Sequence, residues 1–425
     1  MSLEEQQNLE ATYVMHTFGR KPVEFVRGEG MELVDDQGNT YLDFIAGIGV
    51  ISLGHCHPAV VGALQSQAER LIHVSNYYYI EGRGEVAHRL SDLLNAGAPA
   101  DAEPWQSFFA NSGAEANECA IKLARLHARK RAEARALAAG AGEDEARAAA
   151  AAAPRVIVTL DASFHGRTMA TLAATAQPAK QEAFQPLPDG FAHTPLNDVA
   201  ALEALFAARG DEICAVMVEC VQGEGGVHPC TPEFLAAARK LTEERDALLI
   251  CDEVQTGVFR CGAPFAFQRF GIVPDVVTIA KGVASGMPTG MCAARASVAA
   301  AFEPGDHGST FGGSNLAVAA AQATLRTLAD EGFAERVERV GAYLRARLAE
   351  LPDVVEVRGL GLMVAADVAE GIDANDVVLR GLGEGLVLNA TGPRTLRFLP
   401  PLVCEERHVD ALVEGLARLL APLSS

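Results

Sequence analysis

Residues 248–255, with the sequence LLICDEVQ, and residues 275–282, with the sequence DVVTIAKG, decide the fold of this chain. Each stretch is a short apolar run that ends on a charged residue, Asp252 in the first and Lys281 in the second. Apolar runs of this length predict strands that are buried on both faces of a parallel sheet. Open α/β sheets bind their ligands at the carboxyl ends of such strands. The two charged side chains are therefore expected to meet at a ligand site.

A carboxylate and an amine at one edge of a sheet are the pair of groups that pyridoxal phosphate (PLP) requires. The amine of Lys281 condenses with the PLP aldehyde, and the carboxylate of Asp252 keeps the pyridine nitrogen protonated so that the ring accepts electrons. Each residue alone has a common structural explanation, Asp as the N-cap of the next helix and Lys as a solvated surface residue. The neighbouring motifs decide in favour of the cofactor.

Further apolar runs at 107–110, 156–159 and 214–218 alternate with helical patterns from about residue 59 to 330. Such alternation predicts βαβ units, a mostly parallel sheet and an α/β fold. After about residue 330 the pattern changes to a long helix, short strands and a terminal helix, which indicates a smaller α+β domain. We expect residues 1–58 to join this small domain, 59–315 to form the large ligand-binding domain, and 316–425 to complete the small one.

Residues 131–153 are rich in Ala and contain a Gly- and Glu-rich turn at 140–145. Ala is the strongest helix former. The stretch predicts an extension of the preceding helix, a polar turn and a second short helix. With no apolar stripe beyond Ala, it is expected to be a solvent-exposed insertion outside the chemistry.

Composition restricts the class of protein. The chain has 425 residues and a net charge of −20, which argues against binding to nucleic acid or to an anionic membrane surface. No apolar run approaches the roughly 20 residues of a membrane span, and the acidic, polar residues 1–10 do not form a signal peptide. The nine Cys residues lack CxxC spacing and indicate reduced, buried thiols in a cytoplasmic protein. We expect no metal site, including at His55-Cys56-His57.

Two motifs follow predicted strands and suit a phosphorylated heterocycle. Residues 111–117, NSGAEAN, open a helix with small residues, where backbone N–H groups and the helix dipole favour a phosphate. Residues 163–168, SFHGRT, offer Phe164 for stacking on a flat ring and Arg167 for holding a carboxylate. Taken singly, Phe164 is equally well explained as core packing and Arg167 as part of a surface ion pair.

Three later segments add polar groups. Residues 218–226 form a strand end followed by a Gly-rich acidic loop, and residues 308–314, GSTFGGS, offer hydroxyls and backbone donors in a turn. Arg397 stands in the apolar run 396–401, where a buried guanidinium needs a partner or an anionic ligand. Glu224 is the candidate partner.

Together these motifs resemble the class III PLP-dependent aminotransferases, also called subgroup II or ω-aminotransferases, of fold type I. The resemblance covers nearly the whole chain except 131–153, and within the family it is strongest to the acetylornithine aminotransferases. Residues 41–58, 74–78 and 396–402 carry that closer resemblance. It implies a large domain with a mostly parallel seven-stranded sheet and a homodimer with shared active sites.

The resemblance implies that Lys281 binds PLP and later moves a proton between substrate and cofactor, and that Asp252 pairs with the pyridine nitrogen. It assigns the phosphate to Ser112, Gly113 and Ala114, with Thr310 from the other subunit, the ring faces to Phe164 and Val254, and the ring hydroxyl to Gln255. Arg397 would hold the α-carboxylate of glutamate or 2-oxoglutarate, Arg167 the distal carboxylate, and Ser309 would touch the substrate. Glu224 would neutralise Arg397 whenever the amine donor presents no α-carboxylate to it.

Three positions refine the comparison. Ala114 stands where the family often has Thr, which removes one hydroxyl from the phosphate cup, and Cys220 stands where Pro is usual. At Ile48, ornithine aminotransferases carry a Tyr that recognises the free α-amino group, so an aliphatic side chain favours an acylated amine. The expected reaction moves the δ-amino group of N2-acetylornithine to 2-oxoglutarate in arginine biosynthesis.

Other reactions stay open. Succinylornithine, N-succinyl-diaminopimelate, 4-aminobutyrate or ornithine are alternative donors, and an aminomutase or decarboxylase of the same fold is a further one. The carboxylate-binding Arg167 and Arg397 argue for transamination with glutamate. A transcriptional regulator would need a basic DNA-binding module, for which there is no room before residue 20.

Overall fold

The computed structural model describes residues 2–329 and 332–421. Its centre is a seven-stranded sheet in which the strands lie in the order β4-β12-β11-β10-β7-β5-β6. Only β12 runs antiparallel to its neighbours, which confirms the predicted mostly parallel sheet. The strands are β4 (Trp105–Ala110), β5 (Val156–Leu160), β6 (Phe191–Thr194), β7 (Ile213–Val218), β10 (Leu248–Asp252), β11 (Val276–Ile279) and β12 (Gly290–Arg295).

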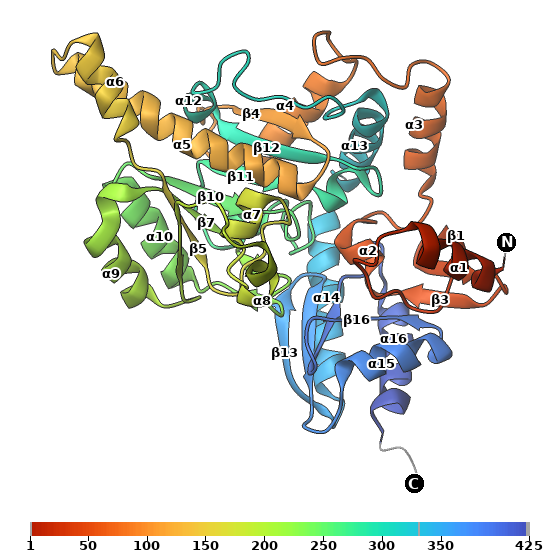
Figure 1. Cartoon of the computed structure of the whole chain (residues 1–425). Helices are drawn as coiled ribbons and strands as arrows, with labels where there is room; N and C mark the ends of the chain where they lie inside the picture. The colour runs from red at the N-terminus through yellow and green to blue at the C-terminus, as the bar shows by residue number, and fades with distance from the viewer. Residues whose placement is uncertain (1, 330–331, 422–425) are drawn as a thin grey trace.

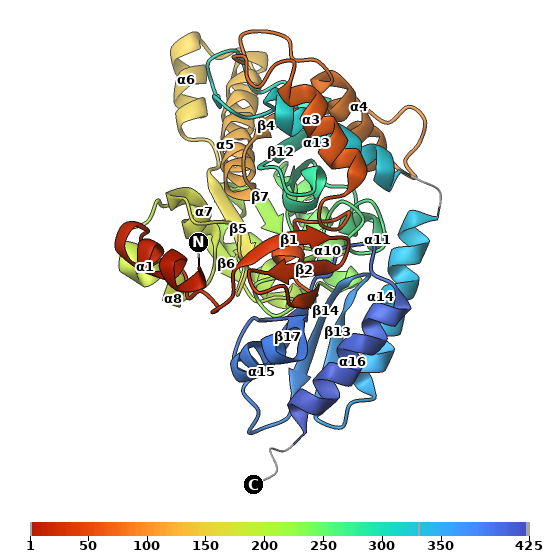
Figure 2. The ribbon, with the colours of Figure 1, turned by 90° about the vertical axis from the view of Figure 1, so that its right-hand side faces the viewer.

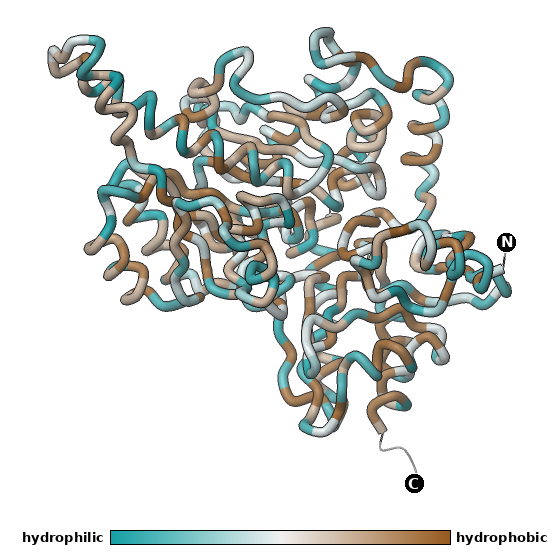
Figure 3. The backbone as a smooth tube through the Cα atoms, viewed as in Figure 1, coloured by the Kyte–Doolittle hydropathy of each residue, from teal (hydrophilic) through white to brown (hydrophobic). Residues whose placement is uncertain are grey.

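The sheet is buried on both faces because successive side chains of its central strands enter different cores. On β10, Leu249 and Cys251 belong to one hydrophobic core, whereas Leu248 and Ile250 belong to the other. A strand with two buried faces has no polar alternation, which is the pattern that residues 248–252 show. Figure 3, which colours the chain by residue hydropathy, shows hydrophobic stretches (brown) in this part of the molecule.

Helices cover both faces of the sheet (Figure 1). Helix α5 packs across β4, β12, β11, β10 and β7, and α10 packs on β10 and β7. The helices of this part are α3 (Pro58–Ala68), α4 (Arg83–Leu94), α5 (Gly113–Ala138), α7 (Met169–Ala174), α8 (Pro178–Gln181), α9 (Val199–Arg209), α10 (Pro232–Glu244), α11 (Ala266–Arg269), α12 (Ala296–Ala299) and α13 (Asn315–Leu328). Short 3-10 turns are η1 (Glu182–Phe184), η2 (Gly210–Glu212) and η3 (Lys281–Ala284), and β8 (Val221–Gln222) pairs with β9 (His228–Pro229).

The C-terminal part is a smaller α+β unit, seen in blue in Figure 2, where α14 and α16 lie side by side. Its sheet has the order β13-β14-β17-β16, and all its pairings are antiparallel. The elements are α14 (Phe333–Ala349), β13 (Val354–Leu360), β14 (Met363–Val368), α15 (Ala374–Gly381), η4 (Leu382–Glu384), β16 (Asn389–Ala390), β17 (Thr395–Phe398) and α16 (Glu406–Leu420).

The N-terminal segment pairs with the C-terminal part of the chain. Strands β1 (Phe25–Glu29), β2 (Glu32–Asp35) and β3 (Thr40–Asp43) form a meander whose last strand takes β15 (Leu386–Val387) as a parallel neighbour. Helix α1 (Leu3–Tyr13) precedes the meander and α2 (Ala46–Gly49) follows it. The domain boundaries at residues 58 and 315 stay predictions.

The Ala-rich stretch is helical, as predicted. Helix α5 continues to Ala138, and α6 (Glu143–Ala151) begins after the polar turn. The expectation of full solvent exposure is wrong at Ala146 and Ala150, which are buried, because α6 folds back against α5. Methyl groups are small enough for two helices to approach closely. Helix α6 and the end of α5 lie at the far upper left of Figure 1.

Among the described residues, no helix combines the length and the apolar character needed to cross a bilayer. The described part also contains no cluster of potential metal ligands; His55 Nε2 instead contacts Asp43 Oδ2 at 2.8 Å. All nine cysteines are free, and eight are buried, as expected. The exception is Cys56, which is exposed because it lies in the loop before α3.

Gly341 of α14 lies against the turn between β13 and β14. A Cβ atom there would lie 1.9 Å from the carbonyl oxygen of Gly361, so Gly341→Ala is expected to destabilise the fold by about 1–3 kcal/mol. At Gly62 of α3 nothing lies within 4 Å, and Gly62→Ala is expected to be neutral or to stabilise by about 0.4–1 kcal/mol. Thermal unfolding of the two variants measures the contrast, and equal midpoints would refute the packing argument.

Candidate active site

A cavity of about 470 Å³, here called the main cavity, opens at the carboxyl ends of the central strands. Both Asp252, the last residue of β10, and Lys281, the first of η3 after β11, line it. Seven further residues that the sequence singled out line the same cavity: Ser112, Gly113, Ala114, Phe164, Arg167, Val254 and Gln255. Parallel strands end at one edge of a sheet, which is why residues from distant motifs converge here.

The carboxylate of Asp252 is buried and surrounded by donors. Its Oδ2 accepts a hydrogen bond from Asn117 Nδ2 at 2.8 Å and contacts His165 Nδ1 at 2.7 Å. Its Oδ1 accepts from the backbone N–H of Val254 at 3.0 Å. Most of the fixed donors thus act on one oxygen, and Oδ1 keeps capacity for a further donor such as a protonated ring nitrogen.

His165 completes this network from the buried side. Burial lowers the pKa of His165, but the hydrogen bond to Asp252 and the charges of Asp252 and Glu219 outweigh burial, so that the pKa lies above its usual value. The second ring nitrogen, Nε2, is buried without a hydrogen-bond partner among the described residues. The contact with His165 compensates the buried carboxylate and holds it in place.

Lys281 is placed under local strain. Its φ of 48° lies in the left-handed region, which is uncommon for residues other than Gly and is often found at functional sites. Burial lowers the pKa of the Lys281 amine, more than Glu224 and Asp252 raise it. In the part of the chain that the structure describes, no hydrogen bond or ion pair of its amine is found. A neutral amine is the form that attacks a carbonyl carbon.

Helix α5 begins beside the main cavity, where Ser112 is the N-cap residue and its Oγ accepts from the N–H of Glu115. Within residues 2–329 and 332–421, the N–H groups of Gly113 and Ala114 have no acceptor, as expected at a helix start. A Cβ on Gly113 would lie 2.6 Å from Val254 Cγ1, so only Gly lets the helix start and residue 254 approach each other. The cavity-lining hydroxyl of Thr289 also has no partner among the described residues. These free donors suit a phosphate.

Arg397 is buried beside the main cavity and forms an ion pair with the half-buried Glu224. Only 2% of its surface is exposed, and its Nη1 donates to Glu224 Oε1 at 2.6 Å and to Gln255 Oε1 at 3.2 Å. Burial raises the pKa of Glu224, but the charge and hydrogen bond of Arg397 outweigh this and lower it below the usual value. The pairing of Arg397 with Glu224 that the sequence suggested is therefore present.

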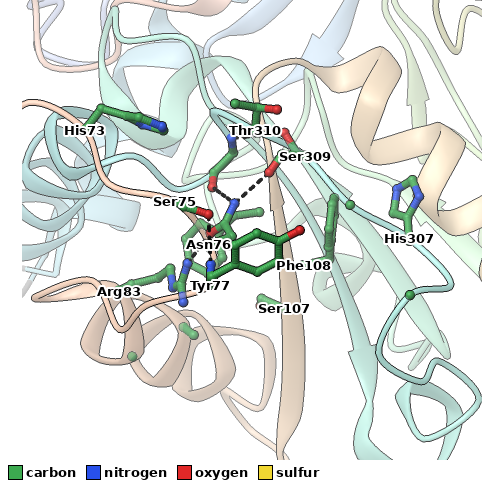
Figure 4. Close-up of a pocket in the computed structure, with 16 residues that line it drawn as sticks. His73, Ser75, Asn76, Tyr77, Arg83, Ser107, Phe108, His307, Ser309 and Thr310 are labelled. Carbon is green, nitrogen blue, oxygen red and sulfur yellow. Dashed lines mark hydrogen bonds between the residues drawn. The ribbon is translucent and has the colours of Figure 1, made fainter.

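Ser309 and Thr310 line a second cavity of about 870 Å³, shown in Figure 4. Asn76 Nδ2 donates to the carbonyl oxygen of Ser309 at 2.7 Å. Ser309 Oγ also accepts from Nδ2 of Asn111, at 3.2 Å, and Asn111 lines the main cavity. Thus Ser309 stands between the two cavities, and Thr310 is not brought to the main cavity of its own chain.

The structure adds three residues to which sequence reasoning gave no role: Asn117, His165 and Glu219. Glu219 accepts hydrogen bonds from the N–H groups of Phe164 and Gly223, and burial raises its pKa to about 7. All three belong to the motifs at 111–117, 163–168 and 218–226. Their spacing in the sequence does not indicate that residues 117 and 165 contact residue 252. Only the positions of strand ends bring them together.

The site combines a buried carboxylate and a buried lysine of lowered pKa at the carboxyl edge of a parallel sheet with a helix start whose free N–H groups suit a phosphate. The pattern described as "Aminotransferase class-III" matches residues 15–420, and the chain belongs to the class III aminotransferases, which are PLP-dependent enzymes. An acetylornithine aminotransferase of Caldanaerobacter subterraneus subsp. tengcongensis is 44% identical over 418 residues, which are 97% of this chain and 98% of that protein.

Solved structures of aminotransferases have the same fold as this chain. The acetylornithine aminotransferase from Elizabethkingia anophelis is similar with a TM-score of 0.81 and 30% identity, and 100% of both chains are covered. An ornithine aminotransferase from Toxoplasma gondii, whose structure has partial occupancy of PLP at the active site, is similar with a TM-score of 0.86 and 32% identity over 99% of this chain and 94% of that chain.

The contact of His165 with Asp252 predicts a pH-dependent stability. Since the pKa of His165 rises above 6.5 on folding, the contribution of the pair is fully present below pH 6.5 and is lost as the pH rises through the folded pKa. His165→Phe is therefore expected to lower the thermal midpoint of the PLP-free protein more at pH 6 than at pH 9. The exposed His88 serves as control through His88→Ala. An equal loss at both pH values for His165→Phe would contradict a charged imidazole.

Proposed function

We propose that this chain transfers the δ-amino group of N2-acetylornithine to 2-oxoglutarate, giving N-acetylglutamate 5-semialdehyde and glutamate, a step of arginine biosynthesis. The observation that carries the proposal is the ion pair between the buried Arg397 and Glu224, which is connected to the main cavity through Gln255. The two half-reactions use different substrates: the transferred amine of N2-acetylornithine has no carboxylate next to it, whereas glutamate has one. The arginine that binds this carboxylate must therefore be neutralised in the first half-reaction and available in the second.

PLP would supply an aldehyde and an electron-accepting ring to the main cavity. Asp252 would hold the ring nitrogen with the free capacity of Oδ1, while Ser112, Gly113 and Ala114 would hold the phosphate at the start of α5. Phe164 and Val254 would contact the ring faces, and Gln255 the ring hydroxyl. Two observations support the fit of PLP. Donors that line the cavity have no partner among the described residues, and Oδ2 of Asp252 already contacts Asn117 and His165, which leaves Oδ1 for the ring nitrogen.

Lys281 would take a proton from the substrate carbon and return it. Its Nζ is suited to this because burial lowers the pKa of the amine, which brings a lysine closer to the pH at which acid and base roles alternate. The absence of a fixed hydrogen bond to Nζ among the described residues leaves the amine free to move between positions.

Arg397 and Glu224 would sort the two substrates. With N2-acetylornithine, Glu224 stays paired with Arg397 and the substrate carboxylate binds at Arg167. With glutamate, the α-carboxylate replaces Glu224 at Arg397 and the distal carboxylate binds at Arg167, while Ser309 lies close enough to Asn111 to border the substrate. A buried arginine is poorly solvated, so the incoming carboxylate must restore the pairing that Glu224 gives up.

Ile48 and the similarity to known aminotransferases support an acylated amine as the donor. Ile48 lies in α2 with a φ of 66°, two residues before the cavity-lining Val50. An aliphatic side chain offers no hydrogen bond to a free α-amino group. The Caldanaerobacter protein, named acetylornithine aminotransferase, is more similar in sequence to this chain than the Toxoplasma ornithine enzyme is.

The visible absorption spectrum of the purified protein tests the function. We expect a yellow protein that bleaches when N2-acetylornithine is added without keto acid and recovers its colour with 2-oxoglutarate. Bleaching by ornithine or 4-aminobutyrate but not by N2-acetylornithine would refute the substrate and keep the family. A colourless protein that PLP cannot reconstitute would refute the roles of Lys281 and Asp252.

We further propose a cytoplasmic homodimer with shared active sites. Thr310 lines the second cavity rather than the main one, so it would complete the phosphate site of the partner. Tyr77, which lines the second cavity, is 94% exposed, and Tyr79 and Phe311, which are close to lining residues in the sequence, are 101% and 63% exposed. Exposed aromatic side chains of this density are typical of protein interfaces.

Mixed dimers test the sharing of sites. Chains carrying Lys281→Ala and chains carrying Thr310→Val are each expected to be strongly impaired. After random mixing, about a quarter of the wild-type activity is expected to return, because half of the dimers then hold one intact site. Activity that does not rise above the sum of the separate variants would show that each site is built from one chain.

A further inference from the structure

Arg260 is a buried arginine that joins the large part of the molecule to the C-terminal sheet. Only 2% of its surface is exposed, and its Nη1 donates to the carbonyl oxygens of Leu362 at 3.0 Å and Pro400 at 2.5 Å. The backbone N–H of Leu362 donates back to the carbonyl oxygen of Arg260 at 3.0 Å. Within residues 2–329 and 332–421, no other donor reaches the carbonyl oxygen of Leu362 or of Pro400. One side chain therefore satisfies two backbone groups of the C-terminal part.

The backbone just before Arg260 is strained. Val258 and Phe259 have φ values of 55° and 68°, in the left-handed region. This region is uncommon for residues other than Gly and is a genuine outlier for a β-branched residue. Such conformations persist only where the surrounding structure enforces them, and they cluster at functional sites. Two of them in succession turn the chain so that Arg260 enters the junction.

The charge of Arg260 has no ion-pair partner in the part of the chain that the structure describes. Its Nη2 is also buried without a hydrogen-bond partner among those residues. A buried charge without a carboxylate partner contributes less to stability than a well-packed apolar side chain of similar volume. General stability therefore does not explain an arginine here, whereas a need to fix how the two parts pack does.

The strand end that Arg260 holds is the one that carries Arg397. Pro400 lies three residues after Arg397 in the sequence. Arg260 itself ends the segment 252–260, which also carries Gln255, and Oε1 of Gln255 accepts from Arg397 Nη1 at 3.2 Å. The segment thus contacts this strand end twice, once at the guanidinium of Arg397 and once at the backbone of Pro400. Two separate contacts fix both the position and the orientation of the strand end relative to the main cavity.

We propose that Arg260 is a positioning residue for the half-reaction with glutamate. It holds the end of β17 where the guanidinium of Arg397 meets Glu224 and exchanges it for the α-carboxylate of the substrate. The half-reaction with N2-acetylornithine leaves Arg397 paired and uses Arg167 of the large part, so it depends much less on Arg260. The inference rests on the proposed function, because it takes the roles of Arg397 and Arg167 from there.

Arg260→Met tests the proposal, because it removes the donor and the buried charge but keeps a long side chain. Bleaching of the PLP-loaded protein by glutamate and by N2-acetylornithine, each titrated without keto acid, gives an apparent Kd for each amine. We expect the variant to bind glutamate about tenfold more weakly, as for a lost charge-assisted hydrogen bond, and N2-acetylornithine less than about twofold more weakly. Calorimetric titration with glutarate, an unreactive dicarboxylate, is expected to show the same loss as glutamate.

Arg394→Met is the matched control. The guanidinium of Arg394 donates to the carbonyl oxygen of Val368 at 3.0 Å inside the C-terminal part and does not cross the junction. Its loss is expected to change neither affinity. If Arg260→Met does not fold, Arg260→Lys keeps the charge on a shorter side chain and tests the same ratio, with a smaller loss that is again specific to glutamate and glutarate.

Three results would overturn the proposal: a wild type that does not bind glutarate, an Arg260 variant that binds glutamate and glutarate as the wild type does, or one that weakens both amines by the same factor. The last would show that Arg260 only supports the fold. Failure of the proposed function is recognised separately. If N2-acetylornithine does not bleach the wild-type spectrum, the donor is wrong, and the glutarate titration still decides the role of Arg260.

Discussion

The site depends on the contacts that compensate the buried carboxylate of Asp252. A buried carboxylate is costly unless donors and a positive charge compensate it. Here Asn117 and His165 meet one oxygen, and the pKa of His165 is raised by the very carboxylate that it stabilises. The need to bring these two side chains to the end of β10 fixes where α5 begins and how the loop after β5 runs. The phosphate-competent helix start and the ring of Phe164 belong to those same two segments, so they are positioned by the same requirement.

Around this centre four cations differ in their electrostatic surroundings; Lys281 and Arg167 line the cavity, whereas Arg397 and Lys180 are not among its lining residues. Lys281 is made less basic by burial, Arg397 is neutralised by Glu224, and Arg167 and Lys180 carry charges without a contacting carboxylate. The cations thus differ in how readily they accept an anion. A substrate carboxylate can bind Arg397 only by displacing Glu224. Within the described residues, no carboxylate has to be displaced from Arg167 or Lys180. Such differences allow one cavity to accept both a monocarboxylate amine and a dicarboxylate.

The two parts of the molecule meet beside this cavity. Arg397 comes from β17 of the C-terminal sheet, and the residues it contacts, Glu224 and Gln255, come from loops of the large sheet. Arg260 makes a second connection, since its Nη1 donates to the carbonyl oxygen of Leu362 at 3.0 Å. Its burial lowers the pKa to about 10. Buried guanidinium groups at such a junction demand well-placed acceptors and so define how the two parts pack.

The sequence by itself determined the layered α/β fold and the positions of Asp252 and Lys281, because a strand buried on both faces leaves a continuous apolar run and its end is marked by the first charge. It also predicted the Arg397–Glu224 pair, since a lone arginine in an apolar strand requires a partner. It did not reveal the contacts of His165 and Asn117 with Asp252, the cation of Lys180 beside Phe164, or the separation of Thr310 from the main cavity. Those depend on which strand ends and loops become neighbours in space, and no local periodicity encodes a contact between residues that lie far apart in the chain.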